Sequence, residues 1–317
     1  MKYKVLVTAN IDPAGIEYLK SNDCEVLNEE GIKLKRVADY AADCEGILTR
    51  TEIINDAVYE AAENLRVVGK HGVGVDNIDI ENATKRGIQV VNAPEANTES
   101  VVEHTITLIL AIAKNLRAAD REMRSGNYHI RDILYSIEVR EKVLGLIGLG
   151  RIGTQVGLKA FRGLDMRVIA YDPYVDPAMV PEEIELIDSL HDLLSKSDFV
   201  SLHLPYLPST RHIIGADEFN QMKESAYFIN AARGQIVDEN ALIAALSKNR
   251  IAGAGIDVFE VEPPKKENRL FRMDNIILTP HNAALTREAK INMAVHAAMG
   301  IVDVLRGKRP SWTVNTI

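Results

Sequence analysis

Cysteine is scarce in this sequence of 317 residues. Only Cys24 and Cys44 are present, and neither lies in a Cys-x-x-Cys motif or near a histidine at a spacing typical of metal ligands. Two isolated thiols predict neither a disulfide framework nor a metal site, so we expect no bound metal. They are typical of a reduced, cytoplasmic protein.

Long apolar runs are also missing. The longest uncharged apolar stretch, TITLILAIA at 105–113, has nine residues, far fewer than a bilayer-spanning helix needs. The amino terminus, MKYKVLVTAN, has an apolar core of only three residues, too short for the central region of a signal peptide. We therefore expect a cytosolic protein with no membrane partner.

Basic residues are too few to favour a polyanion as partner. The sequence has 37 Lys and Arg against 45 Asp and Glu, a net charge of −8. This balance argues against binding to nucleic acid or to an anionic membrane surface, because both require a basic face. A hydrophobic content of 46% and a charged content of 26% are typical of soluble globular proteins. The length suffices for two ordinary domains or one large one.

What the sequence does contain is a regular alternation of short apolar runs and stretches with helical spacing. Strand, helix, strand repeated in this way predicts the α/β class, with parallel sheets covered by helices on both faces. The runs form two series, so we predict two α/β units. The first series lies at 4–7, 46–49, 66–69 and 88–91, and the second at 143–148, 167–172, 199–204, 226–230, 253–258 and 275–279.

A long apolar helix is predicted between the two series. Ser100 and Glu103 form a capping-box signal for its start, and apolar residues continue to Leu116. They cover nearly the whole circumference, which predicts a buried helix. Either its own subunit covers it, or a second subunit covers part of it, and the second alternative favours a homodimer. The nearest approach to a linker is the segment 125–142.

A glycine-rich turn follows the first strand of the second series. Gly148, Gly150 and Gly153 fit G-x-G-x-x-G between a predicted strand and a predicted helix, and the next strand ends in Asp172. This pattern indicates dinucleotide binding, in which glycines let the backbone approach a pyrophosphate and an acidic residue binds the ribose hydroxyls. An aspartate repels a 2′-phosphate, which favours NAD over NADP. The alternative is a strand-to-helix turn without a ligand.

Charged residues follow the later strands of the same series. Parallel α/β sheets bind ligands at the carboxyl ends of their strands, and Arg233, Asp257, Glu262 and His281 all follow such ends. A guanidinium holds a carboxylate and polarises a neighbouring ketone, while an imidazole donates and accepts a proton. A carboxylate beside the imidazole favours its protonated form. The alternatives are ordinary roles: a loop arginine paired with an acid, a surface histidine and a solvated carboxylate.

Several motifs, in order, resemble one known family. They are GVGVDNID at 72–79, GLGRIG at 148–153, INAARGQIVDENAL at 229–242, GAGIDVFEVEPP at 253–264 and LTPHNAALT at 278–286. These are similar to the signatures of the D-isomer-specific 2-hydroxyacid dehydrogenases, a family that includes phosphoglycerate, glycerate and D-lactate dehydrogenases. The resemblance covers nearly the whole chain, from ILTRT at 47–51 to the terminal helix.

The resemblance implies a Rossmann-type NAD-binding domain at 100–284 and a smaller flavodoxin-like substrate-binding domain at 1–99 and 285–317, with the active site in the cleft between them. It implies Arg233 as the substrate arginine, His281 as the acid–base histidine and Glu262 as its partner. The residues that it implies for cofactor binding are Gly148, Gly150, Arg151, Ile152, Gly153, Asp172, Pro205, Thr210, Ala231, Ala232, Asp257, His281, Ala283 and Ala284.

The substrate is expected to contact Arg233, His281 and a glycine-rich loop. The amides of Val73 and Gly74 in that loop can face a carboxylate, although a plain flexible turn is the alternative. Arg50 is the further expected substrate residue, and Arg50, Lys70 or Arg131 are candidates for binding a phosphate group. The expected reaction is hydride transfer between NAD(H) and a D-2-hydroxy acid or its keto acid, such as 3-phosphoglycerate or glycerate and hydroxypyruvate.

Other readings of the same residues stay open. An NAD-sensing binding protein without turnover would have the same fold. A formate dehydrogenase is disfavoured, because that branch carries glutamine at the position of Glu262. SIEVREK at 136–142 lacks the two glycines of the family's usual run before the cofactor domain, which leaves the path of this loop open. The chain stops soon after its last helix, so for a phosphoglycerate dehydrogenase we expect no regulatory domain.

Overall fold

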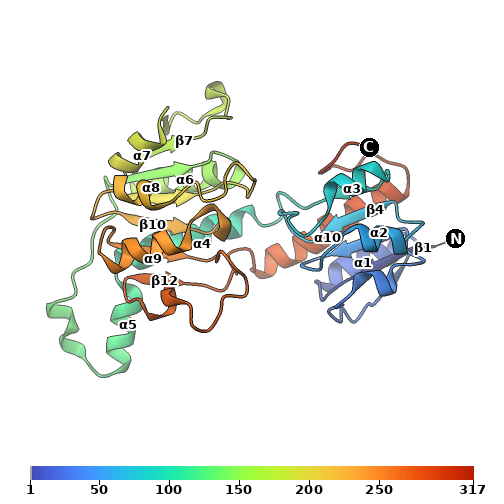
Figure 1. Cartoon of the computed structure of the whole chain (residues 1–317), viewed down its shortest axis with the longest axis horizontal. Coiled ribbons are helices and arrows are strands. Elements are labelled where there is room, and N and C mark those ends of the chain that lie inside the picture. The colour runs from blue at the N-terminus through green and yellow to red at the C-terminus, as the bar shows by residue number, and fades with distance from the viewer. Residues whose placement is uncertain (1) are drawn as a thin grey trace. The chain divides into compact units, whose positions relative to one another are not determined.

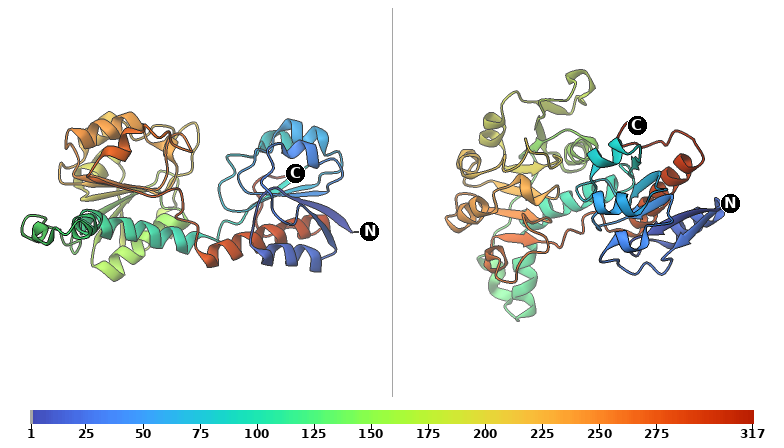
Figure 2. Two further views of the ribbon diagram at one scale, coloured as in Figure 1. Left: turned by 90° about the horizontal axis from the view of Figure 1, so that it is seen from below. Right: turned by 45° about the vertical axis from the view of Figure 1, so that its right-hand side comes forward.

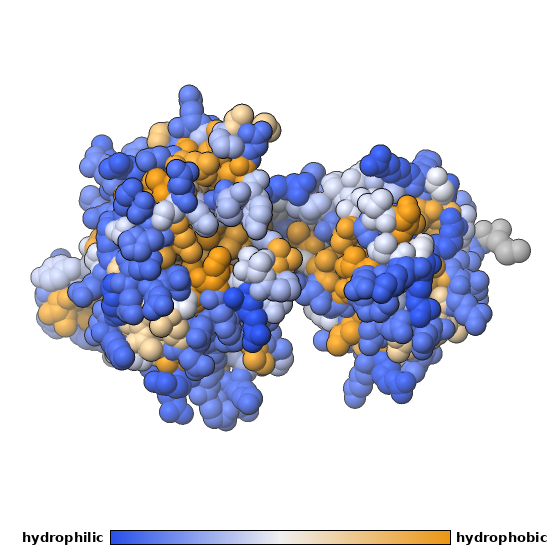
Figure 3. Space-filling view, turned by 45° about the horizontal axis from the view of Figure 1, so that its top comes forward, coloured by the Kyte–Doolittle hydropathy of each residue, from blue (hydrophilic) through white to orange (hydrophobic). Residues whose placement is uncertain are grey.

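The chain forms two compact α/β units. The computed structural model describes residues 2–317. One unit comprises Met1–Thr98 and Ala284–Ile317, and the other comprises Glu99–Ala283, so the division falls one residue before each expected boundary. Within residues 2–317 no helix is both long enough and apolar enough to cross a membrane. Hydrophilic side chains cover most of the visible face of each unit, with apolar side chains gathered in smaller areas (Figure 3).

The smaller unit is built on a five-stranded parallel sheet in the order β2-β1-β3-β4-β5. This is the strand order of flavodoxin-like folds. The strands are β1 Tyr3–Val7, β2 Cys24–Leu27, β3 Gly46–Thr49, β4 Val67–Lys70 and β5 Gln89–Val91. The helices are α1 Pro13–Ser21, α2 Asp56–Ala61, α3 Ile80–Lys85 and α10 Arg287–Leu305, with a 3₁₀ turn, η1, at Val37–Tyr40.

Side-chain alternation along these strands buries both faces of the smaller sheet. Val5 and Val7 pack with α1 and α10, whereas Leu6 between them packs on the other face with α2 and α3. Figure 2 shows the helices in two layers, one on each side of this sheet. The predicted α/β class is therefore correct for this unit. Cys24 and Cys44 are both buried free thiols of this core.

The larger unit is built on a seven-stranded parallel sheet in the order β12-β11-β10-β9-β6-β7-β8, a Rossmann-type arrangement (Figure 1). The strands are β6 Val143–Ile147, β7 Arg167–Tyr171, β8 Ile184–Leu186, β9 Phe199–Leu202, β10 Tyr227–Asn230, β11 Gly253–Ile256 and β12 Ile276–Leu278. The helices are α4 Thr98–Ala113, α5 Leu116–Arg124, α6 Arg151–Leu164, α7 Leu190–Lys196, α8 Ala216–Gln221 and α9 Glu239–Ser247. The 3₁₀ turns are η2 Tyr128–Asp132, η3 Pro177–Met179, η4 Gly234–Ile236 and η5 Arg269–Arg272.

Helices cover both faces of the larger sheet as well. One apolar core joins the strands to α4 and α6, and the other joins them to α7, α8 and α9. The near-continuous apolar strands, such as Tyr227–Asn230, follow from burial on both faces. The predicted Rossmann-type fold is correct.

The register of the larger sheet aligns the ends of its strands. Leu278, Ile256, Asn230 and Leu202 are successive Cα partners across β12, β11, β10 and β9, and Leu202 is paired in turn with Ile147 of β6. The loops that leave these strands therefore start side by side along one edge of the sheet. The residues that begin them are Thr279, Asp257, Ala231, His203 and Gly148.

The long helix differs from its prediction at both ends. It begins at Thr98, so Ser100 and Glu103 lie inside it and do not cap it. It ends at Ala113, because Asn115 has a left-handed φ of 49° that interrupts the helix before α5. Leu116, predicted to be buried in one continuous helix, starts α5 instead and is 59% exposed. The segment 125–142, expected to resemble a linker, contains η2.

Candidate active site

The turn between β6 and α6 has the geometry that close approach of a phosphate requires. Gly148 has a left-handed φ of 99°, which a side chain would strain. A Cβ on Gly153 would lie 2.2 Å from the carbonyl oxygen of Gly148, so only glycine lets helix and turn pack this closely. At Gly150 a Cβ would meet nothing within 4 Å, which leaves the amino terminus of α6 open to an anion.

Asp172 follows β7 and holds this turn from the side. One carboxylate oxygen accepts a hydrogen bond of 2.8 Å from the N–H of Leu149, and the other accepts one of 2.9 Å from the N–H of Tyr174. Asp172 is only partly buried, and each oxygen has a further lone pair. Its carboxylate is thus fixed beside the glycine turn, with acceptor capacity left for a ribose hydroxyl.

Arg233 lies on a tight turn after β10 that the side chain of Asn230 builds. The Asn230 amide donates to the carbonyl oxygen of Arg233 at 3.0 Å and accepts from the N–H of Ala232 at 3.0 Å. The Arg233 guanidinium donates to the Ala232 carbonyl oxygen at 2.7 Å. Asn230 is buried, so a polar side chain at the end of an apolar strand is satisfied entirely by forming this turn.

Asp257 follows β11, is fully buried, and fixes the loop that carries His281. Its carboxylate accepts hydrogen bonds from the Thr279 hydroxyl at 2.5 Å and from the N–H groups of Asn282 and Ala283 at 3.0 Å each. Its carbonyl oxygen accepts from the N–H of His281 at 2.7 Å. These bonds hold His281 at a left-handed φ of 50°, uncommon for a residue with a side chain.

Glu262 and His281 form a hydrogen-bonded pair. Nδ1 of His281 lies 2.7 Å from one carboxylate oxygen of Glu262, and the other oxygen accepts from the N–H of Phe259 at 3.0 Å. Burial acts to raise the pKa of Glu262, but the hydrogen bonds from His281 and Phe259 and the charges of His281 and Arg233 outweigh it, so the pKa lies below its usual value. Because Nδ1 is engaged, Nε2 is the nitrogen left to face a substrate.

The three side chains come from neighbouring strands. Arg233 follows β10, Glu262 follows β11 and His281 follows β12, and these strands are adjacent in the sheet. Arg233 is close enough to Glu262 for its charge to lower the pKa of that carboxyl. One edge of the sheet therefore carries both the Arg233 guanidinium, which can bind an anion, and the His281 imidazole, which can exchange a proton. The glycine turn lies at the same edge.

The other residues expected at the cofactor lie on the same set of loops. Arg151 and Ile152 begin α6, and Ala231 and Ala232 lie in the turn before Arg233. Pro205 and Thr210 lie in the loop after β9, where the Thr210 hydroxyl donates to the Pro205 carbonyl oxygen at 2.8 Å. Ala283 is buried in the loop after His281, whereas Ala284 is the first residue of the second segment of the smaller unit.

The other residues expected at the substrate, besides Arg233 and His281, lie in the smaller unit, on loops after β3 and β4. Gly72 has a φ of 130°, and the Val73 carbonyl oxygen accepts from the Asn92 amide at 2.9 Å. Gly74 and Arg50 are both partly buried. Arg50 donates its backbone N–H to Glu52 at 3.4 Å.

Two of the cations considered for phosphate binding have protein partners. The Lys70 ammonium donates to the Arg50 carbonyl oxygen and to the Asn77 side chain, and Lys70 is buried. The hydrogen bonds of this lysine thus connect the loops after β3 and β4, and its charge is already engaged by the protein. Arg131 lies in η2, where it donates to the Tyr128 hydroxyl at 2.7 Å and its guanidinium stacks over the Tyr128 ring.

The sequence reasoning did not single out Asn230 or Thr279, which set the turns that carry Arg233 and His281. A signal was present for Asn230, because a polar residue that ends an apolar strand needs a local hydrogen-bond partner. Thr279 gave no comparable signal, since its bond to Asp257 joins two strands.

Fold and site together define a dinucleotide-binding α/β protein with an acid–base pair beside the nucleotide turn. Residues 106–283 match the model of the D-isomer specific 2-hydroxyacid dehydrogenase, NAD binding domain. The chain therefore belongs to the D-isomer specific 2-hydroxyacid dehydrogenase family, as its motifs predicted. Its cofactor is a nicotinamide dinucleotide, for which the open amino terminus of α6 and the unobstructed Gly150 provide the room.

Individual relatives support the same assignment. The chain is 42% identical over 306 residues to D-3-phosphoglycerate dehydrogenase of Archaeoglobus fulgidus. This match covers 96% of this chain but only 58% of the relative. It is 38% identical over 327 residues to glyoxylate reductase of Pyrococcus horikoshii, covering 99% of this chain and 96% of the relative. A solved protein of Thermus thermophilus superposes with a TM-score of 0.90 at 30% identity, covering 98% and 100% of the two chains.

Proposed function

We propose that this protein is an NAD-dependent oxidoreductase that interconverts a D-2-hydroxy acid and its 2-keto acid. One observation carries the proposal: Arg233 and the Glu262–His281 pair leave three adjacent strands at the edge where the glycine turn opens. A 2-keto acid presents a carboxylate beside a carbonyl group, and this set offers one group for each. The names of the relatives, a phosphoglycerate dehydrogenase and a glyoxylate reductase, support the same substrate class.

Each side chain has a distinct task in this proposal. A nicotinamide held at the glycine turn would supply or accept the hydride. Arg233 binds the substrate carboxylate and polarises the adjacent carbonyl group through a charge-assisted hydrogen bond. His281 donates a proton from Nε2 to the carbonyl oxygen during reduction and removes it during oxidation. Glu262 orients the imidazole through Nδ1 and stabilises its charged form.

NAD is the proposed cofactor in preference to NADP because of Asp172. A 2′-phosphate at the adenosine ribose would meet a carboxylate that two backbone N–H groups hold in place. We assign the remaining cofactor contacts to the loops after β6, β9, β10, β11 and β12. The residues proposed for these contacts are Pro205, Thr210, Ala231, Ala232, Asp257, Ala283 and Ala284.

The smaller unit is proposed to bind the substrate, with Arg50 and the backbone of Val73 and Gly74 as its contacts. Its buried Lys70 already has protein acceptors, so we favour Arg50 over Lys70 as the cation for any second anionic group. One relative is named after a phosphorylated acid and another after an unphosphorylated acid. The proposed substrate class is therefore small D-2-hydroxy acids, with 3-phosphoglycerate and glycerate as the leading members.

A panel of keto acids with NADH tests the function. Hydroxypyruvate, phosphohydroxypyruvate, glyoxylate, pyruvate and oxaloacetate are each added to enzyme and NADH, and loss of NADH absorbance is measured. We expect turnover of at least one acid at kcat/KM of about 10⁴ M⁻¹s⁻¹ or more. NADH binding without turnover of any of them would favour the alternative function, a binding protein that senses NAD.

We also propose a homodimer in the cytoplasm. The segment 116–135, which contains α5 and η2, projects from the body of the larger unit (Figure 1) and exposes large apolar side chains, which a second copy would cover. These are Leu116, Met123, Tyr128, Ile133 and Tyr135, each at least 50% exposed. Light scattering is expected to give twice the chain mass of 35.1 kDa, and a monomer would contradict the proposal.

The buried free thiols Cys24 and Cys44 support the proposed location in the cytoplasm, which is a reducing compartment, and cell fractionation tests it.

A further inference from the structure

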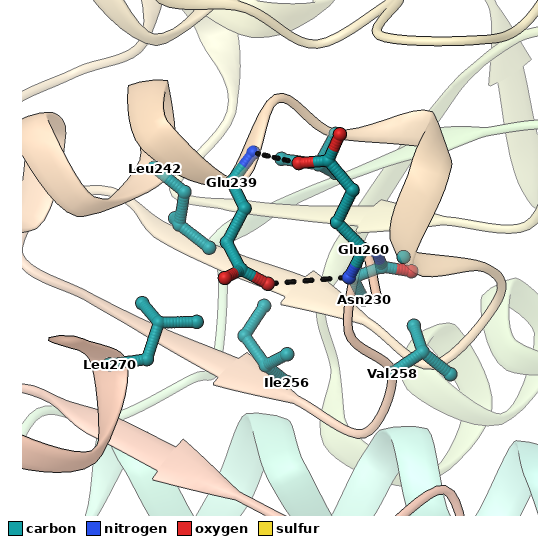
Figure 4. Close-up of a pocket in the computed structure, with 9 residues that line it drawn as sticks. Asn230, Glu239, Leu242, Ile256, Val258, Glu260 and Leu270 are labelled. Carbon is teal, nitrogen blue, oxygen red and sulfur yellow. Dashed lines mark hydrogen bonds between the residues drawn. The ribbon is translucent and has the colours of Figure 1, made fainter. Parts of the chain in front are cut away.

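A second network of polar groups lies directly behind the turn that carries Arg233. Glu239, at the start of α9, and Glu260, in the loop after β11, bond to each other's backbone. The N–H of Glu239 donates to the Glu260 carboxylate at 3.2 Å, and the N–H of Glu260 donates to the Glu239 carboxylate at 3.3 Å. Figure 4 shows the two side chains running beside each other in opposite directions, so that the start of α9 and the loop after β11 are joined by two hydrogen bonds.

Two further side chains complete this network. Nε2 of His212 lies 2.7 Å from the second carboxylate oxygen of Glu260, and the Asn268 amide donates to the second oxygen of Glu239 at 2.8 Å. The N–H of His212 also donates to the Gln235 carbonyl oxygen at 3.0 Å. The two carboxylates would repel each other if they were bare, and these donors offset that repulsion. The network therefore ties the segments after β9, β10 and β11 together.

The network controls a very close contact between two backbones. A Cβ on Gly234 would lie 1.9 Å from the carbonyl oxygen of Phe259, so the chain after Arg233 rests on the peptide before Glu260. The N–H of Phe259 donates to Glu262 at 3.0 Å. A shift of this contact would move Arg233 on one side and the Glu262 carboxylate on the other.

The cavity beside the network is not a ligand site. The free space within it measures about 10 Å³, which holds one water molecule at most. Its wall includes Asn230, Gly234, Glu239 and Glu260, the residues that build or support the Arg233 turn (Figure 4). Polar groups packed this tightly without room for a ligand act on the geometry of their neighbours.

We propose that Glu239 and Glu260 are positioning residues that set Arg233 relative to the Glu262–His281 pair. The proposal rests on the proposed function. The reciprocal pair fixes Phe259 against Gly234, and that contact transmits the placement to Arg233 and Glu262. Because a displacement of about 1 Å from productive geometry can reduce a rate about 100-fold, such support has a measurable effect although neither glutamate touches the substrate.

Glu260→Ala and Glu260→Gln form the matched test. Glutamine keeps an oxygen for the Glu239 N–H and an amide that can bond to Nε2 of His212, whereas alanine removes both contacts. Glu267→Ala, an exposed glutamate in the same loop, is the control. With a keto acid that the wild type reduces, we expect Glu260→Ala to lower kcat/KM about 10- to 100-fold, Glu260→Gln to recover most of it, and NADH affinity by calorimetry to stay within about 3-fold.

A double-mutant cycle with Arg233→Ala separates positioning from general damage. If Glu260 acts by placing Arg233 relative to the Glu262–His281 pair, Glu260→Ala lowers kcat/KM by a smaller factor in the Arg233→Ala background than in the wild type. An equal cost in both backgrounds, or no recovery in Glu260→Gln, would overturn the proposal.

Amide hydrogen exchange provides a readout that does not depend on turnover. We expect faster exchange at 231–237 and 258–262 in Glu260→Ala than in Glu260→Gln or Glu267→Ala, even in a protein that reduces no acid. Unchanged exchange in both segments would refute the proposal. Absence of turnover in the wild type would refute only the proposed function.

Discussion

Nδ1 of His281 lies 2.7 Å from the carboxylate of Glu262, although the two residues follow different strands of the sheet. Phe259 holds the carboxylate from the loop after β11, and Asp257 holds the backbone of the histidine. The imidazole is therefore oriented from both ends before any substrate arrives. Preorganisation of this kind is what proton transfer in a single geometry requires.

Loss of the guanidinium is expected to impair substrate binding and polarisation together. Arg233→Ala leaves the substrate carboxylate without its partner, at a cost of about 2–5 kcal/mol, or roughly 30- to 5,000-fold in kcat/KM. Arg233→Lys keeps the charge but loses the planar fork, so we expect it to recover only part of the loss. Steady-state kinetics are measured for both variants with the keto acid of the panel that the wild type reduces best. Near-full activity of Arg233→Ala would show that Arg233 does not bind the substrate.

The carboxylate of Glu262 is expected to matter through its charge. Glu262→Gln keeps the shape and one acceptor but no longer stabilises the protonated imidazole, so we predict a fall of about 10- to 1,000-fold in kcat for keto-acid reduction. NADH affinity should change little, because Glu262 is not among the cofactor contacts. A variant with unaltered kcat would mean that Glu262 has no part in orienting His281.

Cofactor choice is expected to depend on the charge of Asp172. Asp172→Asn retains an oxygen that accepts a backbone hydrogen bond, so the glycine turn stays supported while the repulsion of a 2′-phosphate disappears. We predict that the ratio of kcat/KM with NADH to that with NADPH falls about 10-fold or more. The same ratio in variant and wild type would show that Asp172 does not face the ribose.

Stability is expected to fall in mild acid because of a histidine outside the proposed catalytic set. Burial, with the nearby charge of Arg50, lowers the pKa of His71 to about 4, and the residue is only 6% exposed. The unfolded chain binds a proton near pH 6.5 that the folded chain refuses until about pH 4, so the stabilisation is present above pH 6.5 and is lost as the pH falls through this window. Between pH 7 and pH 5 the loss amounts to about 2 kcal/mol.

Urea denaturation at pH 7 and pH 5 measures this effect. His71→Leu should lose less free energy of unfolding across the window than the wild type does, by about 2 kcal/mol. His191→Leu is the control, because the His191 side chain is 63% exposed and lies outside the proposed dimer contact. Equal pH dependence in wild type and His71→Leu would contradict the prediction.

The sequence predicted the features that depend on local pattern. Apolar runs located most strands, and the rule that ligands bind at the carboxyl ends of parallel strands placed Arg233, Glu262 and His281 at one edge. Two edge strands, β2 and β8, were missed because they are short and show almost no periodicity. They have four and three residues, and each contains an exposed glutamate. The break at Asn115 was missed because the apolar run continues at Leu116, although asparagine is one of the residues that favour a left-handed helix end.

Other features of the site depend on contacts that no local pattern encodes. The Glu239–Glu260 pair spans 21 residues and forms only because α9 and the loop after β11 pack together. Burial of the Lys70 ammonium against Arg50 likewise follows from the packing of β3 on β4. From the sequence alone, glutamates in polar loops and a lysine after a strand look like ordinary surface charges.

A single-turnover measurement on His281→Ala tests the account most directly. Enzyme in molar excess over NADH, at a concentration at which all the NADH is bound, is mixed with excess keto acid. Each NADH is then oxidised only once, and the loss of its absorbance is followed in wild type and variant. We predict that oxidation of the bound NADH slows about 100- to 10,000-fold in His281→Ala. Transfer at the wild-type rate in His281→Ala would contradict the assignment of the proton donor and, with it, the proposed active site.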